Sequence, residues 1–147
     1  MVAARIVQHP GRFDRVDEVK RAVGQEVLPG DDRLWILGDP VIAEVDGFGR
    51  IEIPVGFTTD GASVPGWAQT LTGWGPWIEP QRSAAIVHDW LYSTKGITKS
   101  FADDVFEALL ESGGAPWWKV KVMKAAVVVG GGAAYRRDQA RGPDIWR

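Results

Sequence analysis

The stretch Arg82-Ser-Ala-Ala-Ile-Val-His-Asp-Trp-Leu-Tyr92 predicts the helix around which the second half of the chain is organised. In a helix, His88 and Tyr92 share a face, whereas Asp89 projects about 100° away. An imidazole and a carboxylate on adjacent but distinct faces can do two jobs at one cleft. One group can accept a proton, and the other can hold a cation.

Composition is that of a soluble globular protein. Of the 147 residues 45% are hydrophobic, which is enough to bury a core, so we expect a single domain over residues 1–147. The chain has no cysteine, which excludes a disulfide scaffold and a thiolate metal site. We expect neither a signal peptide nor a transmembrane helix, because the longest uncharged apolar run, 125–135, is too short to span a bilayer.

The first half of the chain predicts a small antiparallel sheet. Residues 1–30 are charged and weakly periodic, and we expect a short helix at 14–23, with part of the segment forming an arm or irregular chain. The strands are expected at 33–37, 41–46 and 50–55, the last two joined as a hairpin through Gly47-Phe-Gly49. A loop rich in glycine, proline and tryptophan follows at 56–80, and loops of this length are commonly functional.

The second half predicts an antiparallel helix pair plus a C-terminal helix, so the fold class is α+β. This helical half covers 81–135 and is followed by an exposed tail at 136–147. The expected helices cover 80–92, 100–112 and 116–129, with Ser100 as the N-cap of the second helix.

Asp103 lies on the apolar side of the second helix, with Phe106 and Leu110. A carboxylate in that position must find a partner or shift its pKa. In one interpretation, Asp103 caps its own helix from Ser100. In the other, it reaches His88 on the neighbouring helix and fixes the tautomer of the imidazole, which makes a better general base. An ordinary buried core histidine at His88 is a third interpretation.

Asp89 alone is a poor metal site, but backbone carbonyls from a glycine-rich loop can complete a calcium site. Gly73 and Gly75 in the segment Gly73-Trp-Gly-Pro76 are the candidates, and the alternative is that this segment is only a turn-rich connector. Zinc is not expected, because the chain has two histidines and nothing pairs them.

A second compact motif, Asp60-Gly-Ala-Ser-Val-Pro65, predicts a structural turn. Gly61 follows Asp60 as a turn signal, and Ser63 is placed to close the turn. Ser63 lacks the Gly-x-Ser-x-Gly context of a nucleophile elbow, so we interpret it as structural. Asp60 is expected to border the cleft.

The charge is uneven along the chain. Residues 117–147 carry 7 basic and 2 acidic side chains, although the whole chain has a net charge of −2. This basic region is either an ordinary solvated surface or a patch for an anionic surface such as lipid headgroups. Eight tryptophans are many for this length, and exposed ones suit a membrane or protein interface.

Three motifs together resemble a family of uncharacterised small proteins from tailed bacteriophages and prophages. They are Ile53-Pro-Val-Gly-Phe-Thr-Thr-Asp-Gly-Ala-Ser-Val-Pro65, Ala84-Ala-Ile-Val-His-Asp-Trp-Leu-Tyr92 and Ala102-Asp-x-x-Phe106. The resemblance covers roughly residues 33–135. It implies a phage setting and brings no assigned activity.

The pattern His-Asp-x-x-Tyr followed by Ala-Asp-x-x-Phe is also similar to the parvoviral capsid phospholipase A₂ domain and its bacterial relatives. This resemblance implies that His88 is the base that activates water. It further implies that Asp103 orients His88 and that Tyr92 forms a hydrogen bond with that aspartate.

The same resemblance implies a calcium ion held by Asp89. Gly73 and Gly75 would then belong to the calcium loop and the oxyanion site. Calcium would polarise the ester carbonyl and stabilise the developing oxyanion.

These observations lead to two expectations about function. The first is a virion-associated, calcium-dependent lipid ester hydrolase that meets an anionic membrane through tryptophans and the basic C-terminal region. The second is a non-enzymatic tail or capsid component. Either protein would have other virion proteins as partners and would be found in the phage virion or the host cytoplasm. Nucleic acid is not expected as a partner, because only the C-terminal charge favours it.

Overall fold

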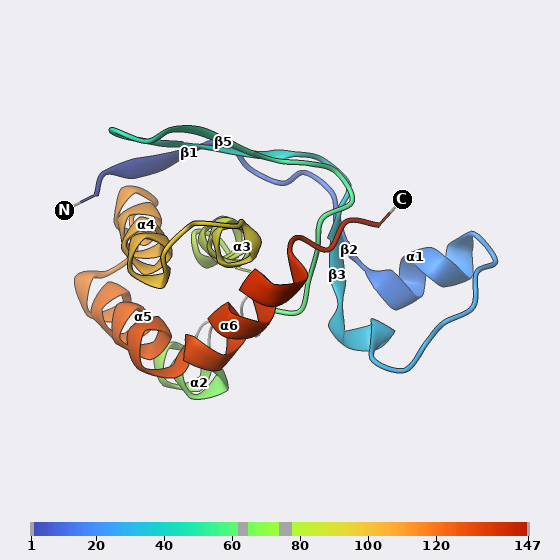
Figure 1. Ribbon diagram of the computed structural model, residues 1–147. Helices are drawn as coiled ribbons and strands as arrows, with labels where there is room; N and C mark the ends of the chain where they lie inside the picture. Colours follow the sequence, from blue (N-terminus) through green and yellow to red (C-terminus); the bar gives the residue numbers. More distant parts are fainter. Residues whose placement is uncertain (1, 62–64, 74–77, 147) are drawn as a thin grey trace.

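The computed structural model describes residues 2–61, 65–73 and 78–146 (Figure 1). Two small antiparallel sheets occupy the first half of the chain, and helices follow, so the α+β prediction is confirmed. In Figure 1 the first sheet lies along one side of the helical half, and the second sheet lies beside the helix of the N-terminal segment.

The first sheet has the strand order β1-β4-β5 and provides an apolar face to the core. Its strands are β1 (Ala4–Gln8), β4 (Val41–Val45) and β5 (Gly49–Ile53). The predicted hairpin is confirmed, with Val41 paired to Ile53 and Val45 paired to Gly49. Alternate residues of β4 are buried, as expected for a sheet with one face on the core.

The second sheet has the strand order β2-β3-β6. Its strands are β2 (Phe13–Arg15), β3 (Trp35–Leu37) and β6 (Thr58–Thr59), and it is flanked by helix α1 (Val16–Ala22) and the 3₁₀ turn η1 (Asp31–Arg33). The interpretation of residues 1–30 as an arm is therefore wrong in part. The two N-terminal strands, β1 and β2, pair within the sheets, because β4 and β3 have edges that need partners.

The helices predicted from the sequence are present, and two further helices were not predicted. The segment 56–80 contains β6 and a short helix, and the C-terminal region is helical up to Arg141, so neither is the structureless segment that we expected. The observed helices are α2 (Gly66–Thr72), α3 (Gln81–Ser93), α4 (Lys99–Ser112), α5 (Trp117–Gly130) and α6 (Gly132–Arg141).

Helix α3 is the centre of the fold. Nearly every residue from Gln81 to Ser93 is buried, because α4, α6 and the first sheet all pack against it. Helix α4 runs antiparallel to α3, as predicted, but its N-cap is Thr98 and not Ser100. The Thr98 hydroxyl accepts a hydrogen bond from the Phe101 backbone at 3.1 Å, which satisfies a free amide of the first turn.

The C-terminal segment returns to the core. Gln139 of α6 donates hydrogen bonds to the carbonyl oxygens of Tyr92 and Thr94, at 2.8 and 2.7 Å, at the end of α3. Beyond α6, Ile145 forms a bridge with Phe57 beside β6. The prediction of a tail at 136–147 is wrong for this reason, although several of these residues are exposed, as predicted. None of the helices in the described ranges is long and apolar enough to cross a membrane.

Candidate functional site

Antiparallel packing of α3 and α4 brings His88 and Asp103 together. Nε2 of His88 lies 2.7 Å from Oδ1 of Asp103, and the Tyr92 hydroxyl donates to the same oxygen at 2.7 Å. Tyr92 lies one turn after His88 and shares its face, so both donors reach one carboxylate. The sequence-based expectation that these three residues converge agrees with this geometry.

A lysine binds the second oxygen of the Asp103 carboxylate. Lys99 Nζ lies 2.7 Å from Oδ2 of Asp103, and it also donates to the carbonyl oxygen of Val127 at 2.7 Å. Lys99 thereby connects Asp103 to the C-terminal end of α5. Sequence reasoning missed Lys99, although it lies four residues before Asp103 and therefore on the same helix face.

The environment of this cluster is apolar and closed. The His88 side chain is 0% exposed and the Asp103 side chain 3%. The imidazole contacts the rings of Tyr92 and Phe106, with centroids 4.1 and 4.9 Å away. Gly131 leaves room for the Tyr92 hydroxyl, because a Cβ at that position would lie 2.6 Å from it. We name His88, Tyr92, Lys99 and Asp103 the α3–α4 polar cluster.

Burial sets the charge states of the cluster. It lowers the pKa of His88, despite the opposing effect of Asp103, so the imidazole is neutral near pH 7. Burial would raise the pKa of Asp103, but hydrogen bonds from His88, Lys99 and Tyr92 outweigh it and hold that pKa below its ordinary value. Burial and the Asp103 carboxylate raise the pKa of Tyr92, so its hydroxyl stays protonated. A neutral imidazole beside a carboxylate donates from Nε2, which leaves Nδ1 as the basic nitrogen.

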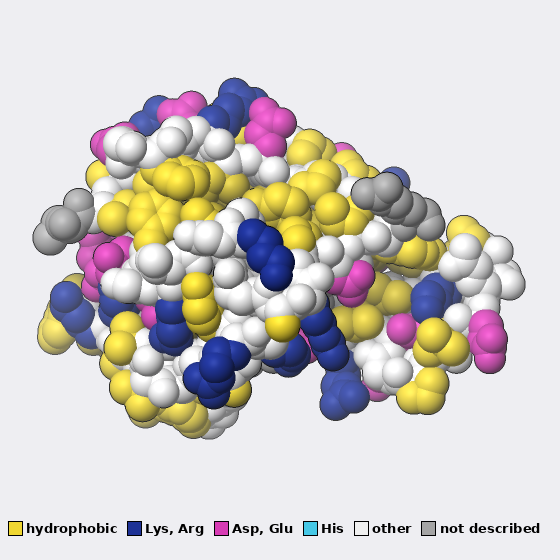
Figure 2. All heavy atoms as spheres, in the orientation of Figure 1, with side chains coloured by type: hydrophobic (Ala, Val, Ile, Leu, Met, Phe, Trp, Pro, Cys, Tyr) yellow, Lys and Arg dark blue, Asp and Glu magenta, His cyan; other side chains and the backbone are white. Residues whose placement is uncertain are grey.

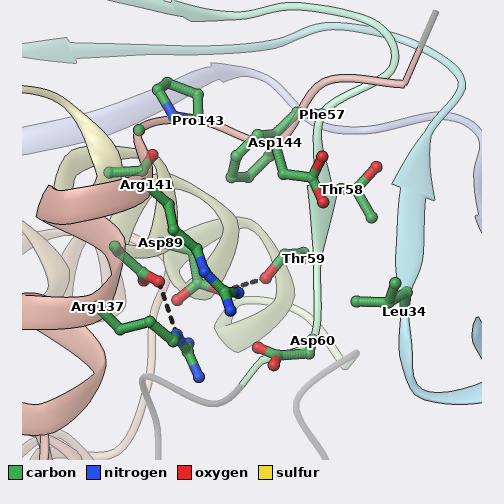
Figure 3. Close-up of a pocket in the computed structure, with 13 residues that line it drawn as sticks. Leu34, Phe57, Thr58, Thr59, Asp60, Asp89, Arg137, Arg141, Pro143 and Asp144 are labelled. Carbon is green, nitrogen blue, oxygen red and sulfur yellow. Dashed lines mark hydrogen bonds and ion pairs between the residues drawn. The ribbon is translucent and has the colours of Figure 1, made fainter. Parts of the chain in front are cut away.

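Asp89 points to a different place, as the helical spacing predicted. It is 6% exposed and lines a pocket of about 360 Å³ between β6, the end of α3 and α6 (Figure 3). Its Oδ2 accepts a short hydrogen bond from the Thr59 hydroxyl, and the backbone amide of Gly61 donates to that hydroxyl at 3.2 Å. Asp60 lines the same pocket, as expected for a residue that borders the cleft.

The opposite wall of the pocket comes from α6. Arg137 and Arg141 lie one turn apart, and both side chains extend from α6 into the pocket (Figure 3). Nε of Arg137 lies 3.1 Å from Oδ1 of Asp138. Sequence reasoning missed these residues, because we interpreted residues 136–147 as a tail and the i, i+4 spacing of the two arginines has meaning only in a helix.

The described residues around Asp89 do not fit a calcium ion. Calcium takes six to eight oxygen ligands, and in the described part of the chain no three His, Asp or Glu side chains lie close enough together to hold a metal ion. Two guanidinium groups line the same pocket. Gly73 ends α2 with a φ of 71° and does not line the pocket. Gly75 and Ser63 lie outside the described residues.

Comparison with known proteins places these motifs in a family. The model of a family described as "Protein of unknown function (DUF1353)" matches residues 35–127, which contain His88, Asp89 and Asp103. The chain belongs to the DUF1353 family. The matched segment includes one wall of the pocket, with Thr59 and Asp60, and excludes α6.

A curated relative gives no further function. The uncharacterized protein y4jT of Sinorhizobium fredii is 33% identical over 79 residues, which cover 54% of this chain and 23% of that protein. This DUF1353 chain thus aligns with less than a quarter of the length of that relative. No solved structure matches the chain.

Proposed function

We propose that this DUF1353 protein is an ester hydrolase of phospholipase A₂-like architecture, in which His88 is the general base. The observation that supports the proposal most is the hydrogen bond from Nε2 of His88 to Asp103, with Tyr92 on the same oxygen. Asp103 orients the imidazole, and Nδ1 would take a proton from the water that attacks the ester carbonyl. The imidazole is fully buried, so hydrolysis requires that the chain covering His88 moves aside when substrate binds.

An exposed apolar patch supports a lipid as the substrate. Trp67 and Leu71 lie one turn apart on α2, and Val128 and Val129 lie at the end of α5, which packs against α2. These four side chains are 51–83% exposed, and we name them the α2–α5 patch. Figure 2 shows hydrophobic side chains over this part of the surface with lysine and arginine side chains beside them.

The α2–α5 patch lies close to the α3–α4 polar cluster. The carbonyl oxygens of Val127 and Val128 accept hydrogen bonds from Lys99, which also binds Asp103. A membrane that covers this patch would therefore lie next to the proposed base. Apolar side chains flanked by cations are suited to an anionic bilayer surface. Calcium enters the proposal through the phospholipase A₂ resemblance alone, and no step above uses it.

The test is fatty-acid release from phosphatidylglycerol vesicles, measured with calcium and with chelator. We expect release by the wild type, with a loss of at least about 100-fold in His88→Asn, because a general base contributes that much or more. His9→Asn is the matched control, since His9 is the only other histidine. Circular dichroism establishes that each variant is folded. Equal release by folded wild type and folded His88→Asn would contradict the proposal.

A second candidate function is a non-enzymatic component of a phage particle, in its tail or capsid. One observation favours a non-enzymatic role: His88 is fully buried, and three donors already satisfy Asp103. A buried polar network of this kind can serve to fix the helix packing. Wild-type protein that is folded, inactive on every vesicle and destabilised by His88→Asn would favour this candidate.

A further inference from the structure

The pocket beside Asp89 already contains positive charge. Arg137 and Arg141 provide two guanidinium groups, and four carboxylates line the same pocket: Asp60, Asp89, Asp138 and Asp144. The arginine pair therefore halves the formal negative charge of the lining. Calcium affinity depends on the charge and number of the oxygen ligands, so this pair weakens the pocket as a calcium site.

The two arginines are held in place by the fold. Gln139, which lies between them on α6, donates hydrogen bonds to the carbonyl oxygens of Tyr92 and Thr94 and thereby fixes α6 against α3. Burial would lower the pKa of Arg137, but Asp138 outweighs this effect, and Asp60 and Asp89 raise the pKa of Arg137 further. The Arg137 guanidinium thus remains charged beside Asp89 at any ordinary pH.

A guanidinium group can do part of what a metal does at an ester. It presents several N–H donors in a fixed plane and binds the oxygens of a phosphate or carboxylate in pairs. It also stabilises negative charge that develops on an oxygen in a site from which water is excluded. A guanidinium group is held by its own side chain and needs no oxygen ligands, whereas a calcium ion would need Asp89 as one of its six to eight ligands.

We propose that Arg137 and Arg141 provide the positive charge that the phospholipase A₂ resemblance assigns to calcium beside Asp89, and that they bind an anionic phosphate or carboxylate group of the substrate without a metal. This inference rests on the proposed hydrolase function. In it Asp89 is a positioning residue, bound to Thr59 and facing the arginines, and not a metal ligand. Because α6 lies outside the segment that the family model matches, the inference concerns this chain and not the family.

The test compares wild type with the double variant Arg137→Gln/Arg141→Gln in two measurements. Thermal unfolding with and without calcium measures calcium binding, and vesicle hydrolysis with chelator measures calcium dependence. We expect no calcium effect on the wild type in either measurement.

The double variant should lose about 10-fold or more of its activity on anionic vesicles, as expected for the loss of charged hydrogen bonds. Arg136→Gln, an exposed neighbour on the same helix, is the matched control.

A wild type whose Tm rises with calcium and whose activity disappears in chelator would overturn the inference while supporting the hydrolase. If the wild type hydrolyses nothing, the hydrolase proposal fails, and the arginine site is tested by binding alone. The probe is then dimethyl phosphate, followed by NMR chemical shifts of the pocket residues. Shifts at Thr59 and Asp89 that disappear in the double variant would support an anion site. No shift in the wild type would overturn it.

Discussion

His88 and Asp89 are neighbours in the sequence, yet the fold gives them opposite surroundings. His88 lies in the closed α3–α4 polar cluster, where the Asp103 carboxylate has donors from three residues. Asp89 lines a pocket in which four carboxylates outnumber two arginines. Burial and the nearby Asp60 raise the pKa of Asp138 in that pocket despite Arg137, whereas the pKa of Asp103 is lowered.

The difference follows from helix geometry and has an energetic consequence. A rotation of about 100° between consecutive residues carries one side chain into the core and the next to the wall of a pocket. A satisfied buried carboxylate stabilises the fold, and its removal leaves donors without a partner. A crowded carboxylate in a pocket contributes less to stability and more to ligand binding. Matched substitutions on the two sides therefore separate stability from function.

The largest effect is expected from Asp103→Asn. The change removes a buried negative charge from beside Lys99 and His88, and it replaces one carboxylate oxygen with an NH2 group, which donates hydrogen bonds and cannot accept them. We expect the free energy of unfolding to fall by about 3–5 kcal/mol, the range for breaking one partner of a buried pair. Urea denaturation measures it, with Asp104→Asn as the control, since Asp104 pairs with Lys124 on the surface. A loss as small as that of the control would show that the cluster does not stabilise the helix pair.

The next effect is the pH dependence of stability. In the unfolded chain His88 takes up a proton as the pH falls through about 6.5, whereas burial keeps it neutral in the folded protein. The unfolded state then binds more protons than the folded state. The free energy of unfolding therefore has its full value above about pH 6.5 and decreases as the pH falls below that value. Asp103, whose pKa is also lowered, adds a loss in the same direction closer to its ordinary pKa of 3.8.

Urea denaturation between about pH 7.5 and about pH 5 measures this dependence. We expect a decrease of about 1–2 kcal/mol, since each unit of pKa difference is worth about 1.4 kcal/mol. The decrease should be smaller in His88→Gln and unchanged in His9→Gln. An identical decrease in all three proteins would assign the effect to other groups.

A smaller effect is expected from Tyr92→Phe. This change removes one hydroxyl from Asp103 and keeps the ring contacts of Tyr92 with His88 and Tyr135. The free energy of unfolding should fall by about 1.5 kcal/mol, the lower end of the range for a hydrogen bond to a charged group. Vesicle hydrolysis should fall by a few-fold only, because Lys99 still binds Asp103. A loss equal to that of His88→Asn would mean that Tyr92 acts directly in the reaction.

The smallest effect on stability is expected from Asp89→Asn. The amide oxygen still accepts the hydrogen bond from Thr59, and the substitution removes one charge from the crowded pocket. The free energy of unfolding should change by less than about 1 kcal/mol, against several for Asp103→Asn. Chemical denaturation of the two variants in parallel makes the comparison. Equal losses would mean that the two sides of α3 do not differ in their contribution to stability.

Periodicity and spacing predicted the parts of the molecule that are local. The hairpin around Gly47–Gly49 and the three long helices were predictable, because glycine turns and apolar spacing act within a few residues. The pairing of His88 with Asp103 was also predictable, since two helices joined by a short turn lie antiparallel. Lys99 could have been found by the same i, i+4 reasoning.

The remaining features depend on contacts that are distant in the sequence. The N-terminal strands form because β3 and β4 have open edges, and no local pattern in residues 1–15 indicates this. Helix α6 follows a run of three glycines and was interpreted as a tail, so the arginine wall of the pocket was missed. Residue type alone does not decide whether Thr98 or Ser100 is the N-cap. The backbone path between α3 and α4 decides which hydroxyl reaches the first turn of α4.

The protonation state of His88 tests the central claim most directly. Two-bond ¹H–¹⁵N correlation spectra distinguish a protonated from an unprotonated ring nitrogen, and His88→Gln assigns the signals. At pH 7 we expect Nε2 to be protonated and Nδ1 to be unprotonated, with no titration as the pH is lowered through 6.5 in the folded protein. Protonation at Nδ1 with an unprotonated Nε2, or a histidine that titrates at its ordinary pKa, would contradict the His88–Asp103 pair as described.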